Sequence, residues 1–269
     1  VLLEKPMATG VVACDRILEA AKSSGRALQM GFVCRRMPVV EMAHRCAQDG
    51  RLGRIYHAKA SMYRRRGVPG LGGWFTTKAR SGGGPLIDLG VHLLDATLHL
   101  MGHPRVTRVS GATYSNFGRR MKAYAHTSMW AGPPDFAGTC DVEDHVTALL
   151  RCEGGATIEL NATWAMNIPD NALPDGIALF GEQGGCRFGL QDRALTVATE
   201  AMGVPADLSP HFVADDPMQQ AWDAQARAFA HLLEQGGEPV ATAAQGRAVQ
   251  AVIDAIYRSA TEGREVEVG

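Results

Sequence analysis

Long apolar runs are missing from this chain. No stretch approaches the ~18 apolar residues of a membrane-spanning helix, and no basic segment followed by an apolar one opens the sequence as in a signal peptide. Internal repeats and low-complexity segments are missing too. These absences argue against a membrane protein and a repeat array. With 46% hydrophobic residues among 269, the chain is long enough for one large globular domain or two ordinary ones.

A surplus of charge of one sign is also missing. The 27 Lys and Arg residues nearly balance the 28 Asp and Glu residues, which gives a formal net charge of −1. Binding to nucleic acid or to an anionic membrane needs a basic surface. The composition therefore favours a small-molecule or protein partner.

Closely spaced cysteines are the third absence. The six cysteines are scattered along the chain without a CxxC pair. This spacing argues against a disulfide framework and against structural zinc. Reduced thiols in the cytoplasm are the simplest interpretation.

The first part of the chain has the pattern of a parallel α/β unit. Residues 1–3 look like the end of a buried strand, Thr9 is a candidate N-cap for a helix that ends at Gly25, and residues 27–34 form the next expected strand. Because an apolar run reaches position 1 and no initiator Met precedes it, we expect the natural N-terminus to lie further upstream.

From residue 53 the pattern changes to strands separated by turn residues. The spacing predicts a large, open and mostly antiparallel sheet, so the fold class is α/β followed by α+β. The expected strands span residues 55–63, 106–113, 142–152, 156–164, 177–180, 185–190 and 266–268, and the expected helices span residues 39–48, 218–235 and 243–261.

The most informative segment is a helix-like stretch over residues 82–102. Asp88, His92, Asp95 and His99 follow at spacings of four, three and four, which places them on one side of an otherwise apolar helix. Three interpretations stay open. The polar side fits a solvent or domain boundary, a divalent-cation site, or a proton-transfer site in which Asp88 holds the His92 ring. The sequence has no second His or Cys cluster that would favour the metal.

A polar triplet, Glu4-Lys5-Pro6, follows the first strand. In open α/β sheets, ligands bind beyond the carboxyl ends of the strands, so Lys5 is expected at a binding edge. The glycines at 82–84 are a weaker signal. Residues 76–81 do not look like a strand, so we expect these glycines to form a loop leading into the helix rather than a phosphate site.

Together these motifs resemble the Gfo/Idh/MocA oxidoreductase family, the glucose–fructose oxidoreductase and inositol dehydrogenase group. The matching segments are LLEKPMA at 2–8, GFVCRRMP at 31–38, WF at 74–75, SGGGPLIDLGVHLLD at 81–95, DVED at 141–144, GATIELNATW ending at Trp164 and IYRSATEGREVEV at 256–268. One departure is Val33, which stands where the family pattern has Asn.

The resemblance implies a two-domain oxidoreductase that uses NAD or NADP. Residues 1–36 would be the C-terminal remnant of a Rossmann domain, and residues 37–269 the substrate and oligomerisation domain of a homo-oligomer. The glycine-rich pyrophosphate loop of the family has no counterpart in this sequence. Its place would be upstream of Val1, in a missing segment of about 100 residues.

The family mechanism implies the site residues. Lys5, Asp88 and His92 would be catalytic, and Glu4, Lys5 and Pro6 would contact the cofactor. Asp95 is expected beside the substrate in a supporting role, whereas His99 lies outside the family pattern. A sugar hydroxyl needs a base as its hydride leaves, and a lysine cation stabilises the developing alkoxide.

The implied substrate is a sugar, a cyclitol or a related polyol. Arg64, Arg65, Trp74 and Trp164 are candidate pocket residues, although Trp164 in a strand pattern could equally pack in the core. No metal, nucleic acid or membrane is expected as a partner. Two alternatives remain: a dinucleotide-binding sensor without catalysis, and an NAD-dependent glycosidase.

Overall fold

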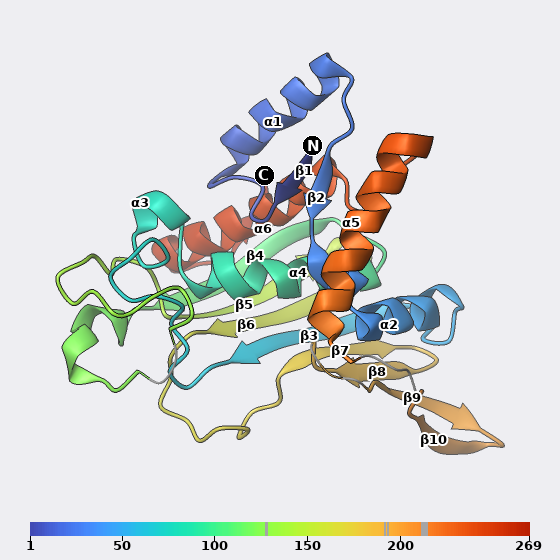
Figure 1. Ribbon diagram of the computed structural model, residues 1–269. Helices are drawn as coiled ribbons and strands as arrows, with labels where there is room; N and C mark the ends of the chain where they lie inside the picture. The colour runs from blue at the N-terminus through green and yellow to red at the C-terminus, as the bar shows by residue number, and fades with distance from the viewer. Residues whose placement is uncertain (127–128, 191, 193, 211–214) are drawn as a thin grey trace.

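The computed structural model describes residues 1–126, 129–190, 192, 194–210 and 215–269. A small parallel sheet lies at one end of the molecule, above a much larger sheet (Figure 1). The small sheet pairs β1 (Leu2–Glu4) with β2 (Gln29–Gly31), and α1 (Val11–Ser24) connects them. This strand–helix–strand unit is the parallel arrangement that the sequence predicts.

The cap of α1 differs from the expectation. The N-cap residue is Gly10 rather than Thr9. Glycine has no side chain, so the N-cap residue makes no capping hydrogen bond of its own. Instead, the Val11 amide donates a 2.9 Å hydrogen bond to the Asp254 carboxylate on a helix near the C-terminus. The end of the helix agrees with the prediction, because Gly25 has the left-handed backbone (φ 62°) that glycine adopts readily.

The large sheet has the strand order β10-β9-β8-β7-β3-β6-β5-β4-β11. Its strands are β3 (Ile55–Tyr63), β4 (Val106–Tyr114), β5 (His145–Cys152), β6 (Thr157–Thr163), β7 (Gly176–Gly181), β8 (Gly185–Phe188), β9 (Thr196–Ala201), β10 (Val204–Leu208) and β11 (Val266–Glu267). All neighbours pair antiparallel except β3 and β6. The mostly antiparallel sheet is confirmed, but the sequence did not predict the β9–β10 hairpin.

The one parallel pair determines where the loops of the sheet meet. The register of β3 and β6 runs from His57 opposite Thr157 to Tyr63 opposite Thr163. Both strands therefore end at the same edge of the sheet. The residues that follow them, Arg64 and Trp164, are brought to that edge together.

One face of the large sheet is the core. Side chains at alternate positions, such as Ala58 and Ala60 in β3 and Ile158 and Leu160 in β6, are fully buried, as expected from the two-residue period of a strand. Helices α4 and α6 lie over this face (Figure 1). The helices are α2 (Pro38–Gln48), α3 (Lys78–Ser81), α4 (Val91–Leu100), α5 (Pro217–Gln235) and α6 (Ala243–Glu262).

The segment expected to be one helix over residues 82–102 has two parts. A π-helical turn, η2 (Leu86–Gly90), precedes α4, and glycines 82–84 form the loop before it. A π turn widens the helix, so the single stripe predicted for an α-helix does not extend to Asp88. Such turns are frequent at functional sites.

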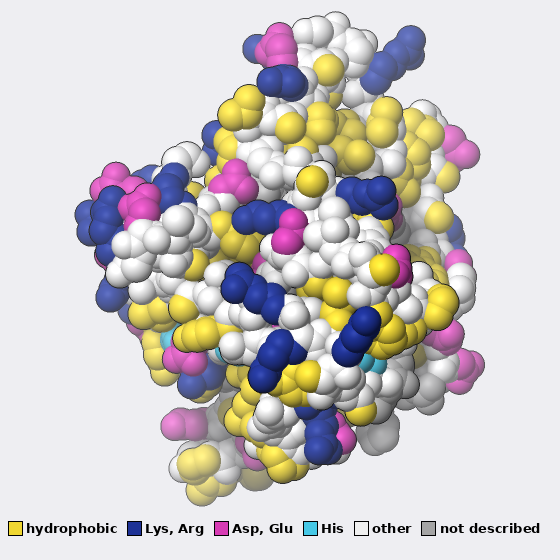
Figure 2. Space-filling model, turned by 90° about the vertical axis from the view of Figure 1, so that its left-hand side faces the viewer, with side chains coloured by type: hydrophobic (Ala, Val, Ile, Leu, Met, Phe, Trp, Pro, Cys, Tyr) yellow, Lys and Arg dark blue, Asp and Glu magenta, His cyan; other side chains and the backbone are white. Residues whose placement is uncertain are grey.

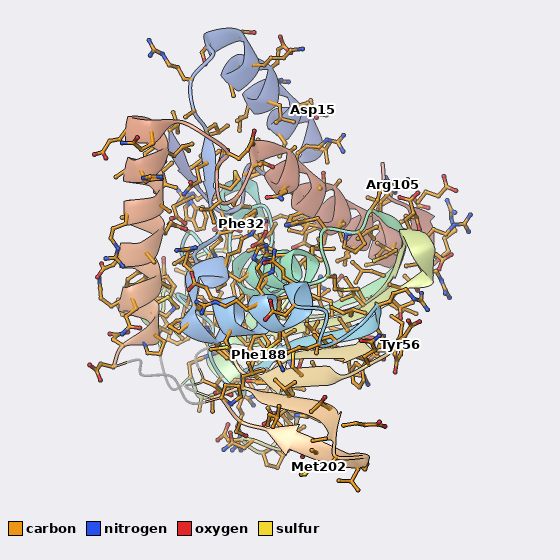
Figure 3. The ribbon with its side chains drawn as sticks, turned by 90° about the vertical axis from the view of Figure 1, so that its right-hand side faces the viewer. Asp15, Phe32, Tyr56, Arg105, Phe188 and Met202 are labelled. Carbon is orange, nitrogen blue, oxygen red and sulfur yellow. The ribbon has the colours of Figure 1, made fainter. Side chains whose placement is uncertain are left out.

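One face of the molecule shows how its charged side chains are distributed. Several Lys and Arg side chains stand across the middle of the face in Figure 2, with fewer Asp and Glu side chains among them. In Figure 3, Phe188 lies inside the molecule, whereas Met202 stands at the tip of the β9–β10 hairpin and is 98% exposed. Within the described residues, no helix is both long and apolar enough to cross a membrane.

Candidate active site

Lys5 lies just beyond the end of β1 and reaches the π-helical turn. Its Nζ donates a 2.9 Å hydrogen bond to the main-chain oxygen of Asp88 and lies 3.4 Å from the Asp88 carboxylate. The two side chains are 18% and 13% exposed. A cation and a carboxylate from segments 83 residues apart therefore form a mostly buried pair that solvent still reaches.

Trp164 completes the surroundings of Asp88. Its indole Nε1 donates a 3.0 Å hydrogen bond to Asp88 Oδ2, the oxygen that Lys5 does not contact. Trp164 follows β6 and is 1% exposed. Its buried ring therefore orients Asp88 and is not open to a substrate, as a pocket residue would be.

His92 has a different partner from the one expected. The sequence suggested that Asp88 holds its ring, but the described residues show no hydrogen bond between these side chains. His92 Nδ1 instead lies 3.5 Å from Cys34 Sγ, in the turn η1 (Val33–Arg36). Burial, and then the nearby Lys5 charge, lowers the pKa of His92 to about 3, so the imidazole is neutral at pH 7.

Asp95 is held by Arg35, a residue that the sequence did not single out. Arg35 donates to both Asp95 oxygens at 2.6–3.2 Å, and each side chain is 1% exposed. The same guanidinium donates to the Val240 carbonyl and to Gln245, which ties α4 to the start of α6. Burial raises the pKa of Asp95 to about 6 against the opposing effect of Arg35, so the carboxylate is still ionised at pH 7.

His99 lies away from Lys5 and Asp88, among other histidines. Its ring stacks on His44 at 4.1 Å and lies 5.6 Å from the His103 ring. Burial lowers the pKa of His99 to about 3 and that of His103 to about 4, and Arg35 adds to both effects. The described residues contain no group of three His, Cys, Asp or Glu side chains placed to hold a metal ion.

A second buried carboxylate, Glu143, supports the turn that carries Asp88. It accepts hydrogen bonds from the amides of Gly84 (3.0 Å) and Leu86 (3.2 Å) and from the Tyr257 hydroxyl (2.8 Å). Burial raises the pKa of Glu143, and these donors oppose the shift. The DVED segment marks this residue in the sequence, but its role depends on partners that only the fold brings together.

The glycines before the π turn are needed for this close packing. A Cβ on Gly83 would overlap the Tyr257 hydroxyl, and a Cβ on Gly84 would overlap the carbonyl oxygen of Glu143. These glycines therefore form a tight loop that leads into the helix, as predicted. The Gly84 amide in this loop binds the buried carboxylate of Glu143.

Aromatic rings extend from the site toward the surface. The Phe75 ring lies 6.5 Å from that of Trp164, and it also meets Trp74 at 5.2 Å and Trp130 at 5.1 Å, all edge-on. Trp74 is 50% exposed and Trp130 is 69% exposed. Trp74, a predicted pocket residue, is therefore accessible to a ligand, whereas Trp164 is not.

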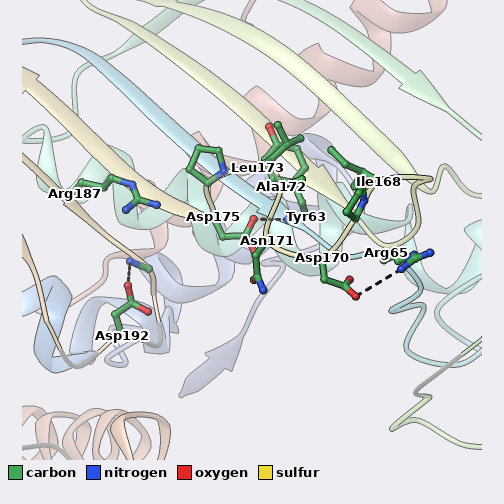
Figure 4. Close-up of a pocket in the computed structure, with 13 residues that line it drawn as sticks. Tyr63, Arg65, Ile168, Asp170, Asn171, Ala172, Leu173, Asp175, Arg187 and Asp192 are labelled. Carbon is green, nitrogen blue, oxygen red and sulfur yellow. Dashed lines mark hydrogen bonds and ion pairs between the residues drawn. The ribbon is translucent and has the colours of Figure 1, made fainter.

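The two predicted pocket arginines point to other places. Arg64 folds back along its own turn, with its guanidinium 3.5 Å from the Gly67 carbonyl. Arg65 lies 3.8 Å from Asp170 and borders a separate cavity of about 350 Å³ (Figure 4). That cavity is lined by Tyr63, Arg65, residues 168–175, Arg187, Gly189 and Asp192, and it contains none of the three predicted catalytic residues.

Glu4, Lys5 and Pro6, the residues expected to contact a cofactor, lie at the carboxyl end of β1. β1 and β2 are parallel, so their carboxyl ends meet at one edge, and Lys5 extends from that edge to Asp88. Gly31 ends β2 without a side chain, and a Cβ there would come within 2.7 Å of a Glu4 carboxylate oxygen. A strand end that carries a lysine cation, with the neutral imidazole of His92 near enough to be affected by its charge, suits a nicotinamide cofactor.

Chemically, the arrangement combines a positive charge with a neutral proton-exchanging group. A lysine cation in this position can stabilise negative charge on a nearby oxygen, and Asp88 orients its ammonium group. His92 is uncharged and able to donate or accept a hydrogen bond, depending on its tautomer. This set suits chemistry in which an alkoxide forms or is consumed.

Comparisons with known proteins find similarity to dehydrogenases and oxidoreductases. The chain is 29% identical over 270 residues to the D-glucoside 3-dehydrogenase of Escherichia coli, covering all of this chain and 72% of that protein. Among solved structures it is similar to the aldose-aldose oxidoreductase of Caulobacter crescentus (TM-score 0.76, 25% identity, 99% of this chain and 71% of that one). A levoglucosan dehydrogenase complex with NADH and levoglucosan shares the fold (TM-score 0.81, 20% identity, 99% and 73%).

The match to a protein family is direct. Residues 40–187, more than half of the chain, match the GFO/IDH/MocA C-terminal domain. They contain the π turn, α4 and strands β3 to β7. The chain therefore belongs to the Gfo/Idh/MocA family of oxidoreductases.

Proposed function

We propose that this chain is the substrate-binding part of an NAD(P)-dependent dehydrogenase that acts on a hydroxyl or carbonyl group of a sugar, a cyclitol or a related polyol. The observation that carries the proposal is the position of Lys5, which is held by Asp88 at the end of β1 close to the neutral ring of His92. The names of the relatives, a glucoside dehydrogenase and an aldose oxidoreductase, support a sugar substrate.

In the proposed reaction, the nicotinamide supplies or accepts the hydride. Lys5 binds the substrate oxygen and stabilises its negative charge, and the Lys5–Asp88–His92 group exchanges the proton of that oxygen with solvent. Glu4, Lys5 and Pro6 border the cofactor. Asp95 supports α4 through Arg35, and the exposed ring of Trp74 offers a face to the sugar.

The domain roles follow from the same proposal. Residues 1–36 form the end of the nucleotide-binding domain, and residues 37–269 form the substrate and oligomerisation domain. The open face of the large sheet, with polar side chains such as Lys59 and Glu159, is the surface available for a second copy.

A dehydrogenase assay on the full-length natural protein tests the proposal. We expect reduction of NAD or NADP with at least one member of a panel of glucosides, free aldoses and inositols. Lys5→Met should lower kcat/KM by at least 100-fold, because it removes the charge and keeps the length of the side chain. Arg45, which is exposed on α2, provides the control Arg45→Met with unchanged activity. A full rate in Lys5→Met would remove the mechanism.

A further inference from the structure

Two exposed indoles, those of Trp74 and Trp130, are joined to the candidate active site by a single phenyl ring. The Phe75 ring meets Trp74 at 5.2 Å and Trp130 at 5.1 Å. It also lies 6.5 Å from the ring of Trp164, whose Nε1 donates to Asp88. Trp164 is buried, Phe75 is partly buried and the two indoles are exposed. These aromatic rings therefore form one cluster that begins at Asp88 and ends in solvent.

The two loops that carry the exposed indoles are held together by their main chains. The Ala131 amide donates to the Pro69 carbonyl, and the Asp135 amide donates to the Leu71 carbonyl, both at 2.9 Å. The loops also pack without room for a further side chain, because a Cβ on Gly72 would overlap the carbonyl oxygen of Asp135. The indoles are thus presented by a tightly packed pair of loops, which is the kind of support that a binding surface needs.

The chemistry of this surface suits a ring. Large aromatic side chains that stay exposed next to one another commonly mark a binding site. The face of an indole is electron-rich, so it attracts the weakly positive C–H edges of a sugar ring or of another aromatic ring. Between Lys5 and the indoles lie Asp88, Trp164 and Phe75. A ring bound on the indoles is therefore a different part of the substrate from the oxygen that Lys5 would bind.

We propose that Trp74 and Trp130 form an outer subsite for a second ring of the substrate, so that the preferred substrate is a glycoside with a ring as its aglycone and not a free monosaccharide. The inference rests on the proposed function, which places the reacting hydroxyl at Lys5. The aglycone, a second sugar or an aryl group, stays chemically unchanged. Its binding energy serves to position the hydroxyl that reacts.

The selectivity of the full-length natural protein is the first readout. The probes are the methyl and phenyl glucosides of both anomers, with maltose and cellobiose as disaccharides. For at least one anomer, kcat/KM should be about tenfold higher with a ring-bearing probe than with methyl glucoside, because a stacked aromatic contact contributes about that factor. Equal kcat/KM for methyl glucoside and every ring-bearing probe would overturn the inference and leave the dehydrogenase proposal standing.

Two substitutions of Trp130 locate the effect. Trp130→Ala removes the ring, so the ratio of kcat/KM between the ring-bearing probe and methyl glucoside should fall at least about threefold. Trp130→Phe keeps an aromatic face and should keep most of the ratio. Trp222, an indole on α5 that is 52% exposed, provides the matched control Trp222→Ala, which should keep the wild-type ratio.

The same variants separate a sugar subsite from a protein contact. An unchanged ratio in Trp130→Ala would overturn the inference. If that variant also changed the oligomeric state measured by light scattering, the two indoles would belong to an interface between copies of the chain instead.

Direct binding gives a readout that needs no turnover. In isothermal titration calorimetry, phenyl glucoside should bind with a lower Kd than methyl glucoside, and Trp130→Ala should remove the difference. This result in a protein that oxidises none of the sugars would contradict the proposed dehydrogenase and leave the subsite intact. Equal Kd values in such a protein would overturn the subsite as well.

Discussion

The indole of Trp164 and the carboxylate of Asp88 form a 3.0 Å hydrogen bond at the edge where β3 and β6 end together. Lys5 contacts the other carboxylate oxygen, so Asp88 is fixed from two sides by groups from distant parts of the chain. A carboxylate held in this way cannot rotate without losing a donor. The Lys5 ammonium that it orients is therefore held in place, as the proposed function requires.

Trp164→Phe tests this positioning role. The variant keeps the buried ring and removes the N–H donor, which leaves Asp88 Oδ2 without its partner. Hydrogen bonds to charged groups contribute about 1.5–3 kcal/mol, so we expect kcat to fall by about 10- to 100-fold with a smaller change in KM. Trp222→Phe on the exposed side of α5 is the control and should keep the wild-type kcat. The same kcat in Trp164→Phe and Trp222→Phe would contradict the positioning role of Trp164.

Sequence periodicity predicted most of the helices and strands because their buried faces repeat regularly. It failed at the π turn, since Asp88 and His92 are four residues apart whether or not the helix widens between them. It also missed the β9–β10 hairpin, whose side chains are largely exposed and give little alternation of buried positions.

In the candidate site, too, the sequence predicted some residues and missed others. Lys5, Asp88 and His92 belong to recognisable motifs, and the structure brings Lys5 into contact with Asp88. Their supporting partners could not be predicted, because Arg35 and Cys34 are ordinary members of a short mixed segment. Their roles depend on contacts with residues about 60 positions away.

The glycine before the π turn should tolerate no side chain. In Gly84→Ala the new methyl group would overlap the Glu143 carbonyl oxygen and push the Gly84 amide off the Glu143 carboxylate. Overpacking costs about 1–3 kcal/mol, and the lost hydrogen bond adds about 1 kcal/mol. Urea unfolding measures the sum. Gly73→Ala, with its nearest atom 3.9 Å away, should change stability by less than about 0.5 kcal/mol.

Removing one partner of the buried ion pair between Arg35 and Asp95 should strongly lower the free energy of unfolding. Arg35→Met leaves a buried carboxylate without its counter-charge, which costs about 3–5 kcal/mol in the free energy of unfolding. The double variant Arg35→Met/Asp95→Leu should be more stable than Arg35→Met, since it removes both charges. The exposed pair of Arg54 and Glu182 is the control, and Arg54→Met should cost at most about 1 kcal/mol. Similar losses in both single variants would contradict the prediction.

Acid should destabilise the protein partly through the stacked histidines. The pKa of His99 is lowered to about 3 in the folded chain, chiefly by burial, from an ordinary value of 6.5. The unfolded chain therefore binds a proton at this position between pH 6.5 and about 3 that the folded chain does not bind. The contribution of His99 to stability is present above pH 6.5 and is lost as the pH falls, by at most about 1.4 kcal/mol per pH unit.

His99→Gln isolates this contribution, because Asp95, whose pKa is raised to about 6, acts in the opposite sense in both proteins. Urea unfolding of the wild type and the variant at pH 7, 6, 5 and 4 gives the difference in their unfolding free energies. The wild type should lose stability faster than His99→Gln as the pH falls, whereas at pH 7 and above the difference should be constant. His231→Gln, at an exposed position on α5, should follow the wild type at every pH. Parallel curves for the wild type and His99→Gln would show that the histidine stack does not contribute to the acid sensitivity.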